Sequence, residues 1–201
     1  MKKTFLFIFG TRPELIKIFP LYLELKKNFK IKVCFTGQHD KLIIDLIKEF
    51  DVKINYKLNS LNFCKNLHEL ISYQNLKLKK IIEKSNPDLV IIQGDTATTF
   101  ASAISAFLLK KKIAYLESGL RTYDKFSPFP EEVFRQNISR LSDYNFCPTI
   151  NNKNNLIKEN IDPDTIFVTG NTIVDAVNLI KKKIKKKKYQ YSRKIFFSYI
   201  T

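Results

Sequence analysis

The feature that most limits the fold of this chain is the regular alternation of short apolar runs with longer amphipathic segments. Short apolar runs such as Thr4–Phe9 and Leu89–Gln93 fit strands that are buried on both faces of a sheet. Segments with helical periodicity, such as Leu67–Ser85, fit helices that cover a sheet. Repeated strand–helix units of this kind build parallel sheets. The sequence therefore predicts an α/β protein with a parallel sheet flanked by helices.

The predicted elements divide the chain into one domain and a short C-terminal part. The other predicted strands are Ile31–Phe35, Ile113–Glu117, Tyr144–Cys147, Thr165–Thr169 and Lys194–Ile200. The other predicted helices are Pro13–Asn28, Lys41–Phe50, Thr96–Leu109, Pro130–Leu141, Asn152–Glu159 and Thr172–Lys186. Residues 181–193 are rich in lysine and are typical of a linker. We therefore expect a domain at 1–180, a linker at 181–193, and at 194–201 an isolated strand that opens a new unit.

The net charge of +16 raises the alternative of a basic module that binds nucleic acid or a membrane. Seven of the lysines lie in one cluster at residues 181–188, and the others are dispersed at predicted helix ends and beside strands. Arginine is scarce, and no basic motif with interleaved aromatic residues occurs. No apolar run approaches the roughly 20 residues that a membrane-spanning helix needs. We therefore expect neither a specific nucleic-acid partner nor a membrane partner.

The cysteines and the N-terminus favour a reducing cytoplasm. Cys34, Cys64 and Cys147 are odd in number and widely scattered, without the spacing of a disulfide framework or a zinc site. The apolar stretch Thr4–Phe9 follows two lysines as in a signal peptide, but it ends at once in Gly10 without a small-residue cleavage site. A buried first strand explains this stretch better, so we expect a cytoplasmic protein.

Polar and charged residues follow the predicted strands at their carboxyl ends. The segments after the first four strands are Gly10–Glu14, Thr36–His39, Gly94–Thr96 and Glu117–Thr122. In a parallel sheet these ends lie along one edge, where ligands bind. We therefore expect the carboxylates of Asp95 and Glu117 to converge in one cleft, although they lie far apart in the sequence.

Most of these residues also have an ordinary structural interpretation. Glu131 and Glu132 follow a proline-rich loop at a predicted helix start, where acids are common, and residue by residue this interpretation is the stronger one. Thr96 can cap the helix that follows Asp95. The chain contains neither GxGxxG nor GxxxxGK[ST], which disfavours the usual NAD and ATP sites. Only two histidines are present, which leaves little for a catalytic triad or a metal site.

Taken in order along the chain, these motifs resemble those of the non-hydrolysing UDP-N-acetylglucosamine 2-epimerases. The matching segments are Gly10–Lys17, Thr36–His39, Gly94–Thr99, Glu117–Thr122, Pro128–Arg135 and Thr169–Asp175. Each segment alone is a weak signal, but the ordered set, over about residues 4 to 180, is specific. The resemblance implies a Rossmann-like sheet that forms the first domain of a two-domain GT-B arrangement.

The resemblance also implies an isomerase that converts UDP-N-acetylglucosamine to UDP-N-acetylmannosamine. The C2 hydrogen of the sugar is not next to a carbonyl, so elimination of UDP across C1–C2 and its re-addition is the sensible route. That route needs no cofactor, but it needs acid/base groups on both faces of the sugar and cations beside the departing diphosphate. The implied catalytic residues are Asp95, Glu117 and Glu131, and the implied substrate-binding residues are Arg12, Lys17, Gln38, His39 and Arg135.

Gln38 and His39 are expected either to touch a second, regulatory nucleotide sugar or to structure their loop. The implied partners are the UDP-sugar substrate and, in the full-length family, a second copy in a homodimer. The chain departs from the family at Ser118, where alanine is usual, at Phe134, where asparagine is usual, and near Asn66, where a glutamine is replaced.

Relatives have a second domain of similar size, so the resemblance implies that this chain is an N-terminal half and inactive alone. The alternatives are a non-catalytic fragment of such an enzyme, a GT-B glycosyltransferase or another UDP-hexosamine epimerase, and, from a different class, a basic nucleic-acid-binding module.

Overall fold

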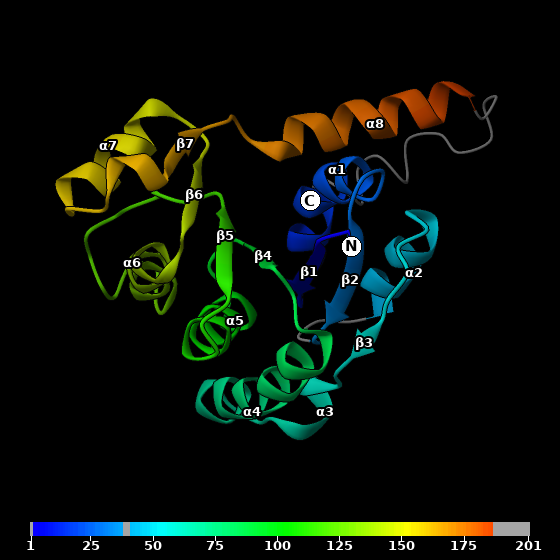
Figure 1. The fold of residues 1–201 in the computed structure, drawn as a ribbon, viewed down its shortest axis with the longest axis horizontal. Helices are drawn as coiled ribbons and strands as arrows, with labels where there is room; N and C mark the ends of the chain where they lie inside the picture. Colours follow the sequence, from blue (N-terminus) through cyan, green and yellow to red (C-terminus); the bar gives the residue numbers. More distant parts are fainter. Residues whose placement is uncertain (1, 38–40, 187–201) are drawn as a thin grey trace.

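The protein is built around one parallel sheet with helices on both faces (Figure 1). The computed structural model describes residues 2–37 and 41–186. The sheet has seven strands in the order β3-β2-β1-β4-β5-β6-β7. The strands are β1 (Thr4–Phe9), β2 (Lys30–Phe35), β3 (Tyr56–Lys57), β4 (Leu89–Gln93), β5 (Lys112–Leu116), β6 (Tyr144–Cys147) and β7 (Ile166–Val168). This arrangement confirms the predicted α/β class and Rossmann-like sheet.

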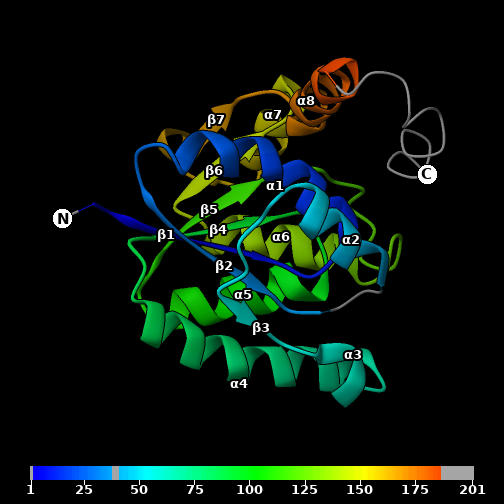
Figure 2. The same ribbon diagram turned by 90° about the vertical axis from the view of Figure 1, so that its right-hand side faces the viewer.

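The helices form two layers on opposite faces of the sheet, as Figure 2 shows. One layer contains α1 (Arg12–Leu25), α2 (Lys41–Glu49), α7 (Ile150–Lys158) and α8 (Thr172–Lys186). The other contains α3 (Ser60–Phe63), α4 (Leu67–Ser85), α5 (Ala97–Leu108) and α6 (Glu131–Leu141). A 3-10 turn, η1 (Pro163–Thr165), precedes β7.

Alternation along β1 supplies apolar side chains to both layers. Phe5, Phe7 and Phe9 face the core beneath α1, α2 and α8, and Leu6 and Ile8 face the core beneath α4, α5 and α6. Successive side chains of a strand point to opposite faces, so a strand buried on both sides must be apolar throughout. This explains the uninterrupted apolar run that imitated a signal peptide.

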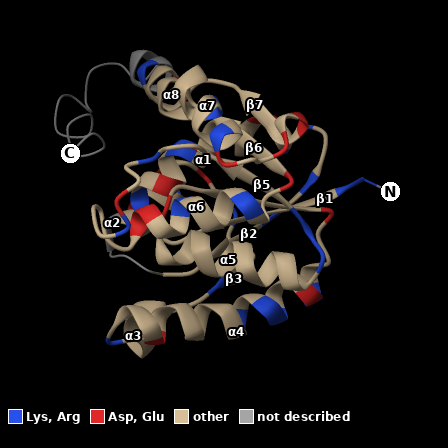
Figure 3. Cartoon of the chain, turned by 90° about the vertical axis from the view of Figure 1, so that its left-hand side faces the viewer, with Lys and Arg blue, Asp and Glu red and all other residues tan. Residues whose placement is uncertain are grey.

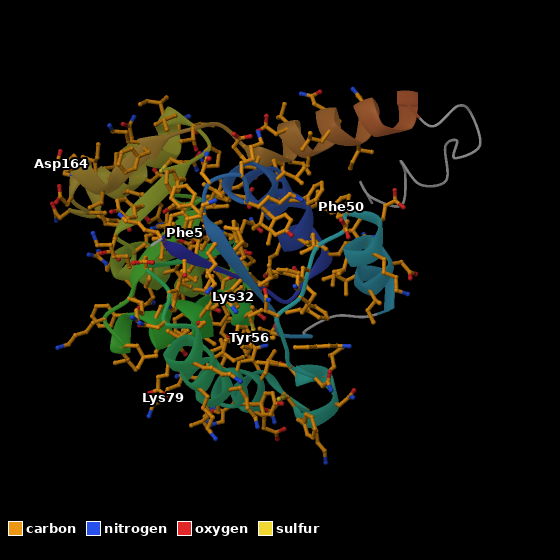
Figure 4. All side chains as sticks on the ribbon, turned by 45° about the vertical axis from the view of Figure 1, so that its right-hand side comes forward. Phe5, Lys32, Phe50, Tyr56, Lys79 and Asp164 are labelled. Atoms are coloured by element: carbon orange, nitrogen blue, oxygen red, sulfur yellow. The ribbon has the colours of Figure 1, made fainter. Side chains whose placement is uncertain are left out.

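Stacked aromatic rings fill much of the core beneath α1 and α2. Phe50, labelled in Figure 4, follows α2 and stacks on Phe19 of α1 with ring centroids 3.9 Å apart. Phe5, also labelled, stacks on Phe29 at 4.3 Å. Such pairs add about 0.5–1.5 kcal/mol each to the free energy gained by burying their surface. These two pairs join the end of α2 to α1 and the segment after α1 to β1.

The structure differs from the predicted elements mainly in short segments. Strand β3 and helix α3 were not predicted. Helix α7 begins two residues earlier than predicted, because Thr149 caps it through a hydrogen bond from the N–H of Asn152. Helix α8 has the predicted bounds, Thr172–Lys186, and it therefore includes residues 181–186 of the predicted linker. The rest of that linker and the predicted strand Lys194–Ile200 lie outside the described residues.

Among the helices of the described residues, none combines the length and the apolar character needed to span a membrane.

The order of the strands reverses at one point, between β1 and β4. From β1 the chain builds outward to β2 and β3, and it then returns to place β4 on the other side of β1 and continues to β7. The loops after β1 and β4 therefore diverge to opposite sides of the sheet. In open parallel sheets, ligands bind in the crevice that this reversal leaves at the carboxyl ends of the strands.

Candidate active site

A pocket of about 470 Å³ opens at the reversal point, at the carboxyl ends of β1, β4 and β5. This volume lies within the range of small-molecule sites. The lining residues are Thr11, Arg12, Pro13, Glu14, Lys17, Ile43, Gln93, Gly94, Asp95, Thr96 and Glu117. Four of the predicted site residues, Arg12, Lys17, Asp95 and Glu117, are therefore brought together, and the predicted convergence of the two carboxylates is confirmed.

The carboxylate of Glu117 is held by donors from three different elements. Glu117 directly follows β5 and has a positive φ of 66°, which turns it out of the strand. Lys17 Nζ lies 2.8 Å from Oε1 and 2.6 Å from Oε2. Gln93 Nε2 donates to Oε2 at 2.5 Å, and Asn171 Nδ2 donates to Oε1 at 3.0 Å. Lys17, predicted to face a phosphate, is thus paired with a catalytic candidate.

Asp95 is paired with Arg135 of α6, another of the predicted substrate-binding cations. Nε and Nη2 of Arg135 both lie 2.7 Å from Oδ2 of Asp95. Burial acts to lower the pKa of Arg135, but the hydrogen bond and the charge of Asp95 outweigh it and raise this pKa. Figure 3 shows acidic and basic segments side by side near the start of α6. Asp95 and Glu117 are thus each paired with a cation of their own.

The two neighbouring acids at the start of α6 have different surroundings. Glu132 is fully buried and accepts hydrogen bonds from the backbone N–H groups of Thr122 at 3.0 Å and Tyr123 at 3.1 Å, and from Gln136 at 2.8 Å. Burial acts to raise the pKa of Glu132, but these hydrogen bonds outweigh it and lower the pKa. Glu132 therefore fixes the loop that precedes α6.

Glu131, the predicted third catalytic carboxylate, is the first residue of α6. Its Oε2 is buried and has no hydrogen-bond partner among the described residues. Within the same part of the chain, Glu131 is not one of the side chains that line the pocket. Its catalytic role stays a prediction.

Glu14 is a pocket residue that the sequence reasoning did not single out. Its Oε2 accepts hydrogen bonds from the N–H of Gly10 at 2.6 Å and of Thr11 at 3.0 Å, and its Oε1 accepts from the hydroxyl of Thr96 at 2.5 Å. Glu14 therefore joins the loop after β1 to the loop after β4. The pattern Thr11-x-x-Glu14 is a capping box, a signal that was available in the sequence.

The carboxyl group of Glu14 is 3% exposed and has a pKa above its ordinary value of 4.5. Burial is the main cause, and it outweighs the hydrogen bonds, which lower the pKa. The negative charge of the neighbouring Asp95 raises it further.

Replacing Glu14 with Gln is expected to raise the stability of the chain at neutral pH. Because the folded-state pKa is raised, the folded protein keeps a proton that the unfolded chain loses near pH 4.5. The free energy of unfolding therefore falls as pH rises from there through the folded-state pKa, by about 1.4 kcal/mol for each unit of difference. Gln keeps the shape of the side chain without ionising, so the free energy of unfolding of the variant should not fall with pH in this range. Denaturant unfolding at a series of pH values measures it.

Glu132→Gln is the matched control for Glu14→Gln. The pKa of Glu132 is lowered, so its stabilising effect is present at neutral pH and is lost as pH falls through the folded-state pKa. Glu132→Gln should therefore lower stability at neutral pH, opposite in sign to Glu14→Gln. An unchanged pH dependence in Glu14→Gln would show that Glu14 does not carry the effect.

Two of the predicted substrate-binding residues, Gln38 and His39, lie outside the described residues. Arg12 lies in the pocket wall beside the start of α1. Arg121, part of the loop motif after β5, has a fully buried side chain that forms an ion pair with Glu159 at 2.6 Å, which indicates a structural role. Gly119 of the same loop has a φ of 86°, and a Cβ there would lie 2.3 Å from the Asn152 carbonyl oxygen.

The departures from the family pattern are accommodated within the fold. Phe134 is buried on α6 and stacks on Phe100 with ring centroids 4.5 Å apart. Ser118 is buried and its hydroxyl donates to Oδ1 of Asn145 at 2.7 Å. Asn66 accepts a hydrogen bond from the N–H of Glu69 and caps α4.

A doubly wound parallel sheet with a charged pocket at its reversal point defines this chain as a Rossmann-like α/β domain of the ligand-binding kind. Residues 22–199 match the family described as UDP-N-acetylglucosamine 2-epimerase. The chain belongs to this family.

Individual relatives agree in sequence and in structure. The UDP-N-acetylglucosamine 2-epimerase of Neisseria meningitidis is 42% identical over 180 residues, which cover 89% of this chain and 48% of the relative. Its crystal structure with UDP-GlcNAc has a TM-score of 0.88 at 41% identity and covers 90% of this chain and 50% of that one. The crystal structure of Methanocaldococcus jannaschii UDP-GlcNAc 2-epimerase in complex with UDP-GlcNAc and UDP has a TM-score of 0.88 at 36% identity. This match covers 97% of this chain and 53% of that one. This chain thus spans about half the length of its relatives.

Proposed function

We propose that this chain is the first domain of an enzyme that epimerises UDP-N-acetylglucosamine at C2 to give UDP-N-acetylmannosamine. The observation that carries the proposal is the pocket at the reversal point, in which Asp95 and Glu117 lie together with Arg12 and Lys17 in a member of this family. A pocket that is rich in both acids and cations suits a substrate that loses a C–H proton together with an anionic leaving group.

The reaction is an elimination followed by a re-addition. A carboxylate removes the C2 proton while the bond between C1 and the UDP oxygen breaks, which leaves a glycal and UDP. A proton is then delivered to the opposite face of C2 as UDP returns to C1. In this proposal Asp95, Glu117 and Glu131 transfer the protons, and Arg12, Lys17 and Arg135 stabilise the charge of the diphosphate.

The ion pairs of Asp95 and Glu117 fit this chemistry. Lys17 is 23% exposed and is bound to Glu117, so an arriving diphosphate competes with that carboxylate for the ammonium group. The ion pair therefore places a phosphate-binding cation directly beside a proposed acid/base group.

The proposed complete protein has two domains and forms a homodimer in the cytoplasm. The relatives are about twice as long as this chain. We propose residues 1–180 as the first domain and the lysine-rich segment 181–193, which begins within the last turns of α8, as the interdomain linker. A groove between α4 and α5 contains Leu76 and Leu108, which are 69% and 68% exposed. An apolar surface of this kind suits contact with a second copy.

The test is to join the chain to the second domain of the Neisseria meningitidis relative and to supply UDP-N-acetylglucosamine in heavy water. Because elimination removes the C2 proton and re-addition takes one from solvent, the expected product is UDP-N-acetylmannosamine with deuterium at C2. Proton NMR of the C2 position and mass spectrometry measure it. Product without deuterium would exclude the mechanism, and no product from a folded protein would contradict the proposed function.

A further inference from the structure

We propose that Asn171 is a positioning residue for Glu117, and that it ties the orientation of this carboxylate to the first turn of α8. The inference rests on the proposed function only in giving Glu117 a catalytic role. Asn171 lies in the loop between β7 and α8, directly before α8 begins at Thr172. It belongs to the segment Thr169–Asp175, one of the motifs that carry the family resemblance.

The side-chain amide of Asn171 bridges two partners. Its Nδ2 donates to Oε1 of Glu117 at 3.0 Å, and its Oδ1 accepts from the N–H of Ile173 at 3.1 Å. A carboxylate only accepts and a backbone N–H only donates, so these two partners fix which end of the amide points to each. One planar group therefore caps the helix and holds the carboxylate.

Among the described residues, Asn171 and Gln93 are the two neutral donors on the carboxylate of Glu117. Lys17 lies within hydrogen-bond distance of both oxygens, so it does not by itself fix the rotation of the carboxylate plane. Gln93 donates to Oε2 and Asn171 donates to Oε1. Because one neutral donor is directed at each oxygen, the pair defines that plane. Loss of Asn171 leaves Oε1 with the lysine alone.

Helix α8 carries this link to the rest of the molecule. Figures 1 and 2 show α8 lying across α1, and Ile173 and the fully buried Ala176 pack into the core that α1 helps to form. Lys17 lies on α1, and Asn171 directly precedes α8. Two of the three described donors on Glu117 are therefore carried by two helices that pack together. A shift of α8 relative to the sheet changes the hydrogen bond from Asn171 and hence the direction of Glu117.

The variants that test this separate capping from positioning. Ser and Asp are both good N-cap residues, so Asn171→Ser and Asn171→Asp keep an acceptor for the first turn of α8. Both lose the amide donor to Glu117. Asn66→Ser and Asn66→Asp are the matched controls, because Asn66 caps α4 through the same kind of hydrogen bond, to the N–H of Glu69 at 2.9 Å, and does not line the described pocket.

The first readout uses the 201-residue chain and does not depend on activity. Gln93 Nε2 donates to the same carboxylate, so a rotated Glu117 should shift the side-chain amide resonances of Gln93 in a proton–nitrogen NMR spectrum. We expect this shift in both Asn171 variants and not in the Asn66 variants, while the thermal unfolding temperature stays within a few degrees of the parent for all four. Unchanged Gln93 resonances in the Asn171 variants would overturn the inference.

The second readout uses the chain joined to a relative's second domain. Misorientation of a catalytic group affects the chemical step more than binding, so Asn171→Ser should lower kcat about 10- to 100-fold with KM within about twofold. A kcat equal to that of the Asn66→Ser control would overturn the inference. If the joined parent has no epimerase activity, the proposed function fails, and the Gln93 resonances still decide whether Asn171 positions Glu117.

Discussion

Replacing Asp95 with Asn, or Glu117 with Gln, should lower the turnover of the joined two-domain protein by at least about 100-fold. Each replacement keeps the size of the side chain and removes its capacity to exchange a proton. Asp95 and Glu117 have side chains that are 29% and 14% exposed and lie at the rim of the sheet, so their loss should leave the fold intact. Initial rates of UDP-N-acetylmannosamine formation measure the effect, and far-UV circular dichroism checks the fold.

Asp88→Asn is the matched control for this pair. Asp88 is a carboxylate that accepts a hydrogen bond from the N–H of Thr4 at 2.7 Å, at the opposite edge of the sheet from the pocket. Its variant should turn over at nearly the parent rate. A near-parent rate in Asp95→Asn or Glu117→Gln would remove that residue from the proton-transfer set.

The fold could be predicted because its main signals are local. An apolar run such as Leu89–Gln93 specifies a buried strand by itself, and the observed bounds of β4 are the same. Strand β3 is only two residues long, Tyr56–Lys57, and makes its hydrogen bonds with the edge of β2. A segment so short has no periodicity, so only the neighbouring strand reveals it.

The site could be predicted as far as topology determines it. Asp95 and Glu117 follow neighbouring parallel strands, so their convergence follows from the sheet alone. The sheet does not determine which side chains pair with these two carboxylates. Lys17 lies 100 positions before Glu117 in sequence, and either a ligand phosphate or a carboxylate suits a lysine at the start of α1.

Asn171 is a second residue whose partner in the fold could not be predicted from the sequence. Its capping role follows from its place before an amphipathic segment, but its second partner lies 54 positions away and is reached through the packing of α8 on α1. Glu14 differs, because its capping box was visible in the sequence. Its contact with Thr96, which joins two loops of the pocket, requires the sheet order that places β4 beside β1.

The isolated 201-residue chain is expected to form no detectable UDP-N-acetylmannosamine from UDP-N-acetylglucosamine. Its pocket has one wall, built from the strand ends of β1, β4 and β5, and the relatives are about twice as long. An interdomain site acts by closing two walls on the substrate, which orients the reacting atoms and excludes water. Orientation alone can account for about 7–11 kcal/mol of a barrier.

The measurement is a comparison of this chain, purified alone, with the same chain joined to the second domain of the Neisseria meningitidis relative, at equal protein concentration. Adding that second domain as a separate polypeptide is the control, because it supplies the missing groups without fixing their position. We expect activity in the joined protein, far less in the mixture and none in the isolated chain. Comparable activity in the isolated chain and the joined protein would show that the residues of this domain complete the site by themselves.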